Sequence, residues 1–196
     1  MQFGSLDDYS NQYFLGMFTI FGDNLREMLL NFTDFCFKAL RACFAFFLVF
    51  LHYDWFHQFF LLIDIIVFDQ PGKIYRFSLI YYIISLIYNS RYQLLIQTDS
   101  IKSIESIYMI YKSANWSERE VWDMFGVFIL FHPDLRRILT DYGFRWFPLR
   151  KDFPLSGIEE MNYSDFIKNT KYFRVELTQE FRNTDYNKRW YSFFPK

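Results

Sequence analysis

Three apolar runs separated by two turn signals constrain the fold of this chain more than any other feature. Residues 59–68 are rich in Ile, Val and Phe and end at Asp69-Gln70-Pro71-Gly72, where Pro sets the first turn angle and Gly allows the positive φ that follows. Residues 75–88 are apolar almost without interruption, which is typical of a central strand. Asn89-Ser90 marks a second reversal before a third run over 91–98. The region predicts an antiparallel meander of three strands.

Helical patterns flank these strands. Residues 23–49 carry Leu, Phe and Met at mixed helical spacing, which predicts one or two packed helices. Between 103 and 111 apolar side chains recur three and four residues apart, which predicts a short amphipathic helix bearing Ile104, Ile107, Tyr108 and Tyr111. Ser117-Glu118-Arg119-Glu120 has the form of a capping box, so another helix is expected to start there and to stop at Gly126.

These elements predict an α+β fold: a two-layer domain with an antiparallel or mixed sheet packed on helices, plus an extended C-terminal tail. We expect three regions: a divergent, helical N-terminal extension over 1–40, the α+β domain over 41–145, and a Pro-containing tail over 146–196. Pro133, Pro148 and Pro154 hold the residues before them extended. Little periodicity follows residue 157, so a tail draped over a partner is preferred to a small second lobe.

Aromatic residues are unusually abundant. Of the 196 residues 52% are hydrophobic and 24% aromatic, more than an isolated domain of this length easily buries. Two explanations remain open: partners cover the excess, or AT-rich codons inflate Phe, Tyr and Ile. The net charge of -1 argues against a nucleic-acid partner, because such proteins use a strong positive field.

Cofactor, membrane and targeting signals are missing. Cys36 and Cys43 lie seven apart, on one face of the expected helix, and are interpreted as core residues. No metal-ligand spacing or glycine-rich nucleotide loop supports iron–sulfur, flavin or nicotinamide binding. The uncharged runs 42–53 and 77–90 are shorter than the roughly 18 to 20 residues of a membrane span. The first residues lack the character of a targeting peptide, so a protein acting in an organelle is expected to be made there.

A dense set of charged residues lies between 118 and 152. Taken alone it suggests an active site with His132 as the acid or base. The opposing interpretation is a structural or interface ion-pair network, which the balanced charges and the lack of a Ser or Cys nucleophile beside His132 favour. Its members are Glu118, Arg119, Glu120, Asp123, His132, Pro133, Asp134, Arg136, Arg137, Arg150, Lys151 and Asp152.

The same stretch carries a sequence signature. Glu118-Arg119-Glu120, Trp122 and Asp123-Met124-Phe125-Gly126 precede the runs 132–139 and 148–155, HPDLRRIL and PLRKDFPL. This pattern resembles the 30 kDa, C-type subunit family of respiratory complex I, the proton-pumping NADH:ubiquinone oxidoreductase. The resemblance extends from about residue 60 to the end. Ser117 replaces a usual Tyr, and Trp146-Phe147 stands where Gly-His is common, so an altered loop is expected near residue 146.

The resemblance implies a non-catalytic scaffold without catalytic, cofactor-binding or metal residues of its own. FMN and iron–sulfur clusters would lie in partner subunits, and the quinone-site (49 kDa-type) and ferredoxin-like subunits would be its neighbours. It would be peripheral on the matrix side of the mitochondrial inner membrane and encoded in the organelle. One alternative is a membrane-surface or membrane-embedded structural protein outside complex I, motivated by the aromatic residues of 35–90. Another is a free enzyme using His132 as a base.

Overall fold

The computed structural model describes residues 16, 25–30, 34–39, 44–55, 58–177, 179 and 182. The chain divides into two compact units, residues 1–153 and 154–196. The predicted division of the chain after residue 145 stays a prediction. Segment 146–153 belongs to the first unit because the ring of Phe147 packs on Trp122 at 5.7 Å between ring centroids, and Arg150 bonds the carbonyl of Phe125.

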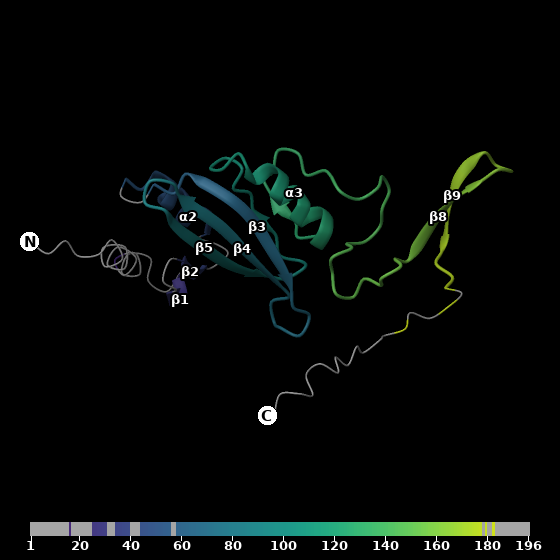
Figure 1. The fold of residues 1–196 in the computed structure, drawn as a ribbon, viewed down its shortest axis with the longest axis horizontal. Helices are drawn as coiled ribbons and strands as arrows, with labels where there is room; N and C mark the ends of the chain where they lie inside the picture. Colours follow the sequence, from purple (N-terminus) through teal and green to yellow (C-terminus); the bar gives the residue numbers. More distant parts are fainter. Residues whose placement is uncertain are drawn as a thin grey trace, which may run out of the picture. The chain divides into compact units, whose positions relative to one another are not determined.

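A five-stranded sheet forms the centre of the first unit (Figure 1). Its order is β1-β2-β5-β4-β3, and β2 runs parallel to β5 while all other neighbours are antiparallel. The strands are β1 Leu25–Leu30, β2 Asp34–Ala39, β3 Leu61–Asp69, β4 Phe77–Ser85 and β5 Ser90–Thr98. The predicted meander is thus confirmed, with β4 between β3 and β5 and the sheet of the mixed kind.

The one or two helices predicted over residues 23–49 are wrong for 25–30 and 34–39 and are confirmed only from residue 44. The described residues there form β1 and β2, and a helix begins only with α2, Phe44–Tyr53. In β2 apolar Phe35, Phe37 and Ala39 alternate with other residues, and this period of two fits a strand. Cys36 consequently lies in a strand rather than on a helix, while the packing of its side chain and all of Cys43 lie outside the described residues.

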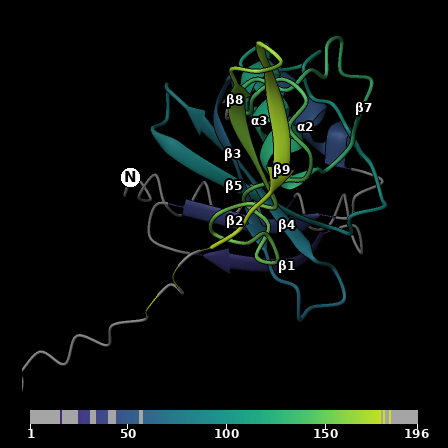
Figure 2. The same ribbon diagram turned by 90° about the vertical axis from the view of Figure 1, so that its right-hand side faces the viewer.

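Helices α2 and α3 cover the same face of the sheet. Phe44 of α2 packs on Tyr81 at 5.6 Å between ring centroids, and Phe125 of α3, Ala114–Phe125, packs on Phe77 at 6.4 Å. Tyr81 and Phe77 are four positions apart in β4 and so point to the same side. Figure 2 shows α2 and α3 together on that side of the sheet. The two-layer α+β prediction is confirmed.

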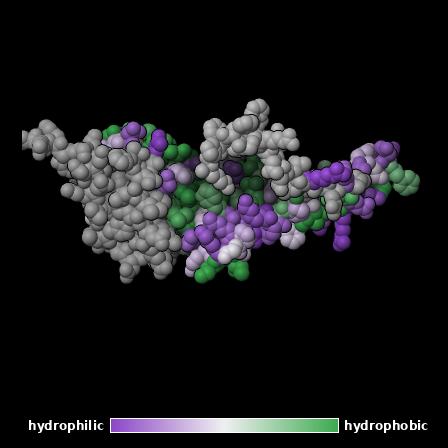
Figure 3. Space-filling model, turned by 60° about the horizontal axis from the view of Figure 1, so that its bottom comes forward, coloured by the Kyte–Doolittle hydropathy of each residue, from purple (hydrophilic) through white to green (hydrophobic). Residues whose placement is uncertain are grey.

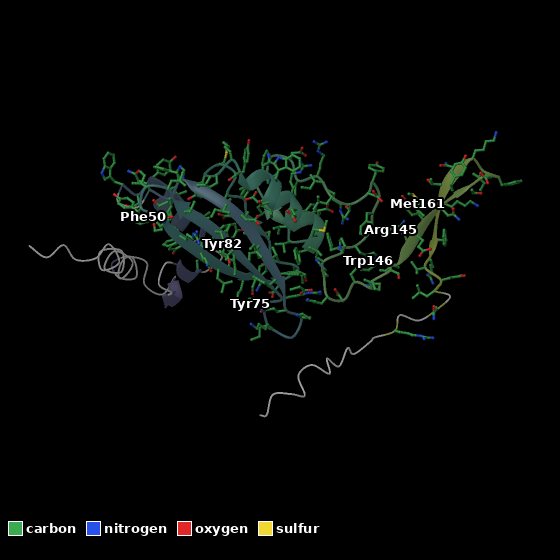
Figure 4. All side chains as sticks on the ribbon, in the orientation of Figure 1. Phe50, Tyr75, Tyr82, Arg145, Trp146 and Met161 are labelled. Carbon is green, nitrogen blue, oxygen red and sulfur yellow. The ribbon has the colours of Figure 1, made fainter. Side chains whose placement is uncertain are left out.

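Alternate residues of the meander are buried beneath the helices. These include Ile65 and Val67 of β3, Leu79 and Ile83 of β4, and Tyr92, Leu94 and Ile96 of β5. The opposite face is less covered: Ile80, Tyr82 and Ile84 are half-buried, and Phe68 is exposed. Figure 4 marks Tyr82 on β4, and Figure 3 shows hydrophobic residues reaching the surface beside hydrophilic ones. Within the described part of the chain, no helix has the length and apolar character needed to cross a bilayer.

The helix predicted for residues 103–111 is also wrong. Ile104–Glu105 form β6, which pairs in parallel with β7, Ile129–Leu130. The backbone amides are used elsewhere, since Ile104 donates to Phe128 O over 3.0 Å and Ile107 donates to the Glu118 carboxylate over 2.7 Å. The periodic side chains Ile104, Ile107 and Tyr111 are nevertheless buried, so the pattern identified a buried face without a helix.

The described residues of the second unit, 154–177, 179 and 182, contain a β-hairpin. β8, Glu159–Ser164, pairs antiparallel with β9, Asn169–Arg174, and almost every residue of both strands is exposed. Met161 faces Tyr172 across the pair, and Tyr163 faces Thr170. These residues share one face, and Met161 is labelled there in Figure 4. The extended tail expected over 146–196 therefore contains paired strands among its described residues.

Candidate functional site

The charged signature residues surround helix α3. The helix begins at Ala114, after Ser113, and ends against Gly126, whose φ of +70° is the left-handed conformation favoured by glycine. The stop at Gly126 is confirmed, but the capping box at Ser117–Glu120 is wrong. Ser117 lies within the helix, where its hydroxyl donates to Asp64 Oδ1 over 3.2 Å.

Glu118 and His132 form a buried pair beneath α3. Their side chains are 2% and 0% exposed, and His132 Nε2 lies 3.6 Å from Glu118 Oε2. Glu118 accepts from the Ser106 hydroxyl over 2.6 Å and from the Ile107 amide over 2.7 Å. His132 Nδ1 accepts from the amide of Asp134 over 3.1 Å, which places the proton of a neutral imidazole on Nε2.

Burial disfavours charge on both members of this pair. It raises the pKa of Glu118 to about 7, against the opposing hydrogen bonds from Ser106 and Ile107. It also lowers the pKa of His132. Near neutral pH the imidazole is therefore uncharged while the carboxyl is close to its midpoint. The pair connects the segment 104–107 and the turn at 132–134 to α3.

Asp123 anchors a loop to the same helix. Its fully buried carboxylate accepts from the amides of Ile138, Leu139 and Thr140 at 3.2, 2.7 and 3.0 Å. Oδ1 also accepts from the Thr140 hydroxyl over 2.7 Å, and Arg137 Nη1 lies 3.8 Å away. Burial alone would raise the pKa of Asp123, but these hydrogen bonds outweigh it and the pKa is lowered.

Arg137 and Arg150 hold the segment 144–150, which follows this loop, in place. Arg137 donates to the carbonyls of Phe144 and Trp146 over 3.1 and 3.0 Å. Arg150 donates to Phe125 O over 2.7 Å at the C-terminal end of α3, where a cation suits the negative end of the helix dipole. The guanidinium of Arg150 also lies 4.4 Å from the Phe147 ring centroid.

The loop near residue 146, which the sequence predicts to be altered, has a residue with a positive φ. Trp146 has a φ of +76°, in the left-handed region that a glycine adopts without strain. Its side chain is exposed and is labelled beside Arg145 in Figure 4. Trp146 thus occupies a backbone conformation that suits glycine.

Arg76 joins two carboxylates at the end of the β3–β4 hairpin. It donates to both oxygens of buried Asp69, at 2.7 and 2.9 Å, and to both oxygens of Asp152, at 2.7 and 3.2 Å. The Lys151 amide donates to Asp69 Oδ2 over 2.8 Å. Asp69 and Arg76 were not among the predicted site residues. Opposite charges at the two ends of one predicted turn were the signal that could have identified them.

The remaining predicted residues lie outward. Arg136 bonds exposed Asp134 over 2.7 Å, and Arg119 donates to the carbonyl of Arg136 over 3.0 Å. Glu120 and Pro133 are exposed at the surface. The predicted set therefore separates into buried anchors and a surface group, and within the described residues no three His, Cys, Asp or Glu side chains gather as metal ligands.

The chain is similar to known respiratory proteins. Residues 38–159 match the model of the family "Respiratory-chain NADH dehydrogenase, 30 Kd subunit". The chain is 50% identical over 144 residues to NADH-ubiquinone oxidoreductase subunit 9 of Prototheca wickerhamii, covering 74% of this chain and 75% of the relative. It is 51% identical over 129 residues to NADH dehydrogenase [ubiquinone] iron-sulfur protein 3 of Solanum tuberosum, covering 66% and 68%.

A bacterial relative and a solved structure extend the comparison. The chain is 48% identical over 129 residues to a subunit of the NADH-quinone oxidoreductase of Paramagnetospirillum magneticum, covering 66% of this chain and 65% of that protein. A chain of the membrane-bound sulfane sulfur reductase, an archaeal respiratory membrane complex, superimposes with a TM-score of 0.64 at 21% identity. This match covers 74% of the present chain and 86% of that one and supports the fold alone.

Proposed function

The chain belongs to the 30 kDa subunit family of respiratory-chain NADH dehydrogenase, and from this membership we propose that it is a non-catalytic scaffold of the peripheral arm of complex I. Its part would be to hold neighbouring subunits in place while their cofactors carry electrons from NADH to ubiquinone. Membership of the NADH–quinone oxidoreductase complex follows from the relatives. The scaffold role is inferred from the way the charged residues are used.

The main observation is that the buried carboxylate of Asp123 accepts hydrogen bonds from backbone amides of its own chain. Four hydrogen bonds from residues 138–140 occupy its two oxygens. Glu118 and Arg150 are likewise bonded to segments of their own domain. Groups held in this way fix loops rather than reacting with a substrate, and His132, with no exposed side-chain surface, is a poor proton donor to a bound molecule.

The exposed hairpin supports a role in assembly. A two-stranded hairpin is only marginally stable by itself in water. In β8 and β9 one face presents Met161, Tyr163 and Tyr172, all exposed. We propose that this face packs on a neighbouring subunit, with the quinone-site (49 kDa-type) and ferredoxin-like subunits as the expected partners.

Electron carriers would belong to the partners. The name of the potato relative refers to an iron–sulfur protein. These 196 residues contain two cysteines, whereas four thiolates typically hold an iron–sulfur cluster. The residues present therefore do not fit a cluster within this chain, and FMN and the clusters are assigned to other subunits. We further propose a peripheral position on the matrix side of the inner mitochondrial membrane and a gene in the organelle.

Native purification tests this proposal. The full-length tagged chain should co-migrate on a native gel with subunits that carry flavin and iron–sulfur clusters, identified by mass spectrometry. The chain should also be released by carbonate once the complex is dismantled. Recovery of the chain alone in the membrane pellet would contradict the scaffold role and favour a membrane-embedded structural protein. Turnover by the purified chain would contradict it as well.

A further inference from the structure

An arginine-lined pocket opens beside the buried anchors. It has a volume of about 690 Å³ and lies between α3, the segment at 136–137 and the loop 140–144. Arg119, Arg136 and Arg137 line it, and Asp141 is the one acidic residue among its described lining residues. The pocket therefore has a net positive lining, in a chain whose overall charge is -1.

The three arginines are not equally engaged. Arg137 is held by two carbonyls and lies near Asp123. Arg136 is paired with Asp134, although 77% of its side chain is exposed. Arg119 uses its Nε–H on the carbonyl of Arg136, and no carboxylate of the described residues forms an ion pair with it. Arg119 therefore lines the pocket with no carboxylate of the described residues within ion-pair distance, although its charge acts on Asp134 from farther away.

Aromatic side chains lie in the same pocket lining and next to Arg119. Tyr142 lines the pocket with its side chain 100% exposed, and Phe144 lies in the same lining. The ring of exposed Trp116 lies 5.6 Å from the Arg119 guanidinium. Tyr, Trp and Arg together are the residues that dominate protein–protein contacts. This composition favours a protein side chain over a free ion as the occupant.

The charge balance favours a carboxylate. A guanidinium binds carboxylate and phosphate equally well in geometry, through two parallel N–H groups. Asp141 in the lining and Asp134, which is paired with Arg136, balance two of the three arginine charges. The one positive charge that is left matches a single carboxylate better than a dianionic phosphate. We propose that the pocket receives an Asp or Glu side chain of a neighbouring subunit, which pairs with Arg119 and packs on Tyr142. This inference rests on the proposed scaffold function and names the chemistry of one of its contacts.

A zero-length cross-link tests the contact in the assembled complex. Arg119→Lys places an amine in the pocket, and carbodiimide joins an amine only to a carboxylate that touches it. Mass spectrometry of the treated complex should find the introduced lysine bonded to an Asp or Glu of another subunit. Arg91→Lys, on exposed β5 residue Arg91, is the matched control and should give no link to that same carboxylate.

Charge reversal supplies an independent readout. Arg119→Glu should reduce the co-migrating complex about tenfold or more, because like charges then meet at the contact. Reversing the cross-linked partner carboxylate to Lys should restore assembly. The melting temperature of the purified variant, expected within a few degrees of the parent, separates this effect from misfolding.

Two outcomes would overturn the pocket assignment. One is full assembly of Arg119→Glu without any cross-link from Arg119→Lys, while the unaltered chain still co-migrates with the complex; the scaffold function would then stand. The other is lost assembly without a protein cross-link, accompanied by loss of phospholipid phosphate from the purified complex. That result would give the pocket a phosphate occupant.

Discussion

Thr140 donates both its hydroxyl and its backbone amide to the carboxylate of Asp123, over 2.7 and 3.0 Å, although the two residues are 17 positions apart. The two bonds close the chain from α3 to residue 140 into a loop fixed at both ends. Arg137 extends the same attachment to Phe144 and Trp146. The buried carboxylate of Asp123 thus fixes the position of the segment that carries Arg136 and Arg137.

Replacing that carboxylate should loosen the segment. Asp123→Ala would remove the acceptor of all four hydrogen bonds and leave the part-buried amides of residues 138–140 without this partner. We expect a loss of about 2 to 4 kcal/mol in the free energy of unfolding, measured by urea denaturation of the purified chain. Glu120→Gln, on an exposed site of the same helix, should change it by less than about 0.5 kcal/mol. Equal losses in the two variants would contradict the anchor role.

The Glu118–His132 pair predicts a measurable pH dependence. The pKa of Glu118 rises from 4.5 to about 7 on folding, so the folded state holds the proton more tightly. Its stabilising contribution is full below about pH 4.5 and is lost as the pH rises through 7, by about 3 kcal/mol in total. His132 acts in the opposite sense, because its lowered pKa removes stability as the pH falls below 6.5.

Glu118→Gln isolates the carboxyl contribution. Gln keeps an acceptor for the Ile107 amide and can donate to the Ser106 hydroxyl oxygen, but it does not ionise. The stability of the variant relative to the parent should therefore increase between pH 5 and about 7 and level off toward pH 8. Thermal unfolding of both proteins across this range measures the difference. A difference that stays constant would mean that Glu118 ionises in the fold as easily as in the unfolded chain.

The sheet was predictable where turn chemistry marked it. Asp69 to Gly72 and Asn89-Ser90 delimit strands through local backbone preferences, so β3, β4 and β5 followed from short-range signals. β2 could not be placed in the same way, because its parallel partner β5 lies far along the chain and contributes no local pattern. For residues 103–111 the helical period located buried side chains correctly. No helix forms, because the Ile107 amide bonds the Glu118 carboxylate and Ile104–Glu105 pair with β7.

The candidate site was only partly predictable for a related reason. Sequence placed Asp123 and Arg137 in one charged set, but it carries no information on which side chains turn inward. Glu118 and Glu120 are two residues apart on one helix, and only Glu118 is buried. The pairing of Arg76 with Asp69 could have been read from the two ends of one turn, whereas its second partner, Asp152, lies 76 residues away and gives no local signal.

Arg76 should be difficult to replace even by lysine. Its planar guanidinium donates hydrogen bonds to both oxygens of Asp69 and to both oxygens of Asp152. The single ammonium group of lysine does not reproduce this geometry. Asp69 is nearly fully buried, so a weakened partner leaves its charge poorly compensated. Arg76→Lys is expected to reduce the free energy of unfolding by about 1 to 3 kcal/mol in urea titrations. Lys73→Arg in the same exposed turn should have little effect, and comparable losses would refute the bridge.

The backbone at Trp146 should favour glycine over other small residues. Its φ of +76° is strained for a side chain with a Cβ and unstrained for glycine. Trp146→Gly should therefore be more stable than Trp146→Ala by about 1 kcal/mol, since both remove the ring and only glycine relieves the backbone. Differential scanning calorimetry of the two variants gives the comparison. A higher melting temperature for the alanine variant would show that the loop relaxes to a negative φ.

Gly126 and Phe147 should be energetically coupled. A Cβ at Gly126 would lie 2.5 Å from Phe147 ring carbons and 2.7 Å from Arg150 Nη2, and its φ of +70° adds backbone strain. Gly126→Ala is expected to cost about 2 to 4 kcal/mol, part of it from the ring contact and part from φ. Phe147→Ala has its own packing cost but removes the contact with the new methyl group. In a double-mutant cycle the combined loss should therefore fall short of the sum by at least about 1 kcal/mol, measured by urea unfolding. Additive losses would mean that the ring moves aside freely, and that segment 146–153 is not packed tightly against the end of α3.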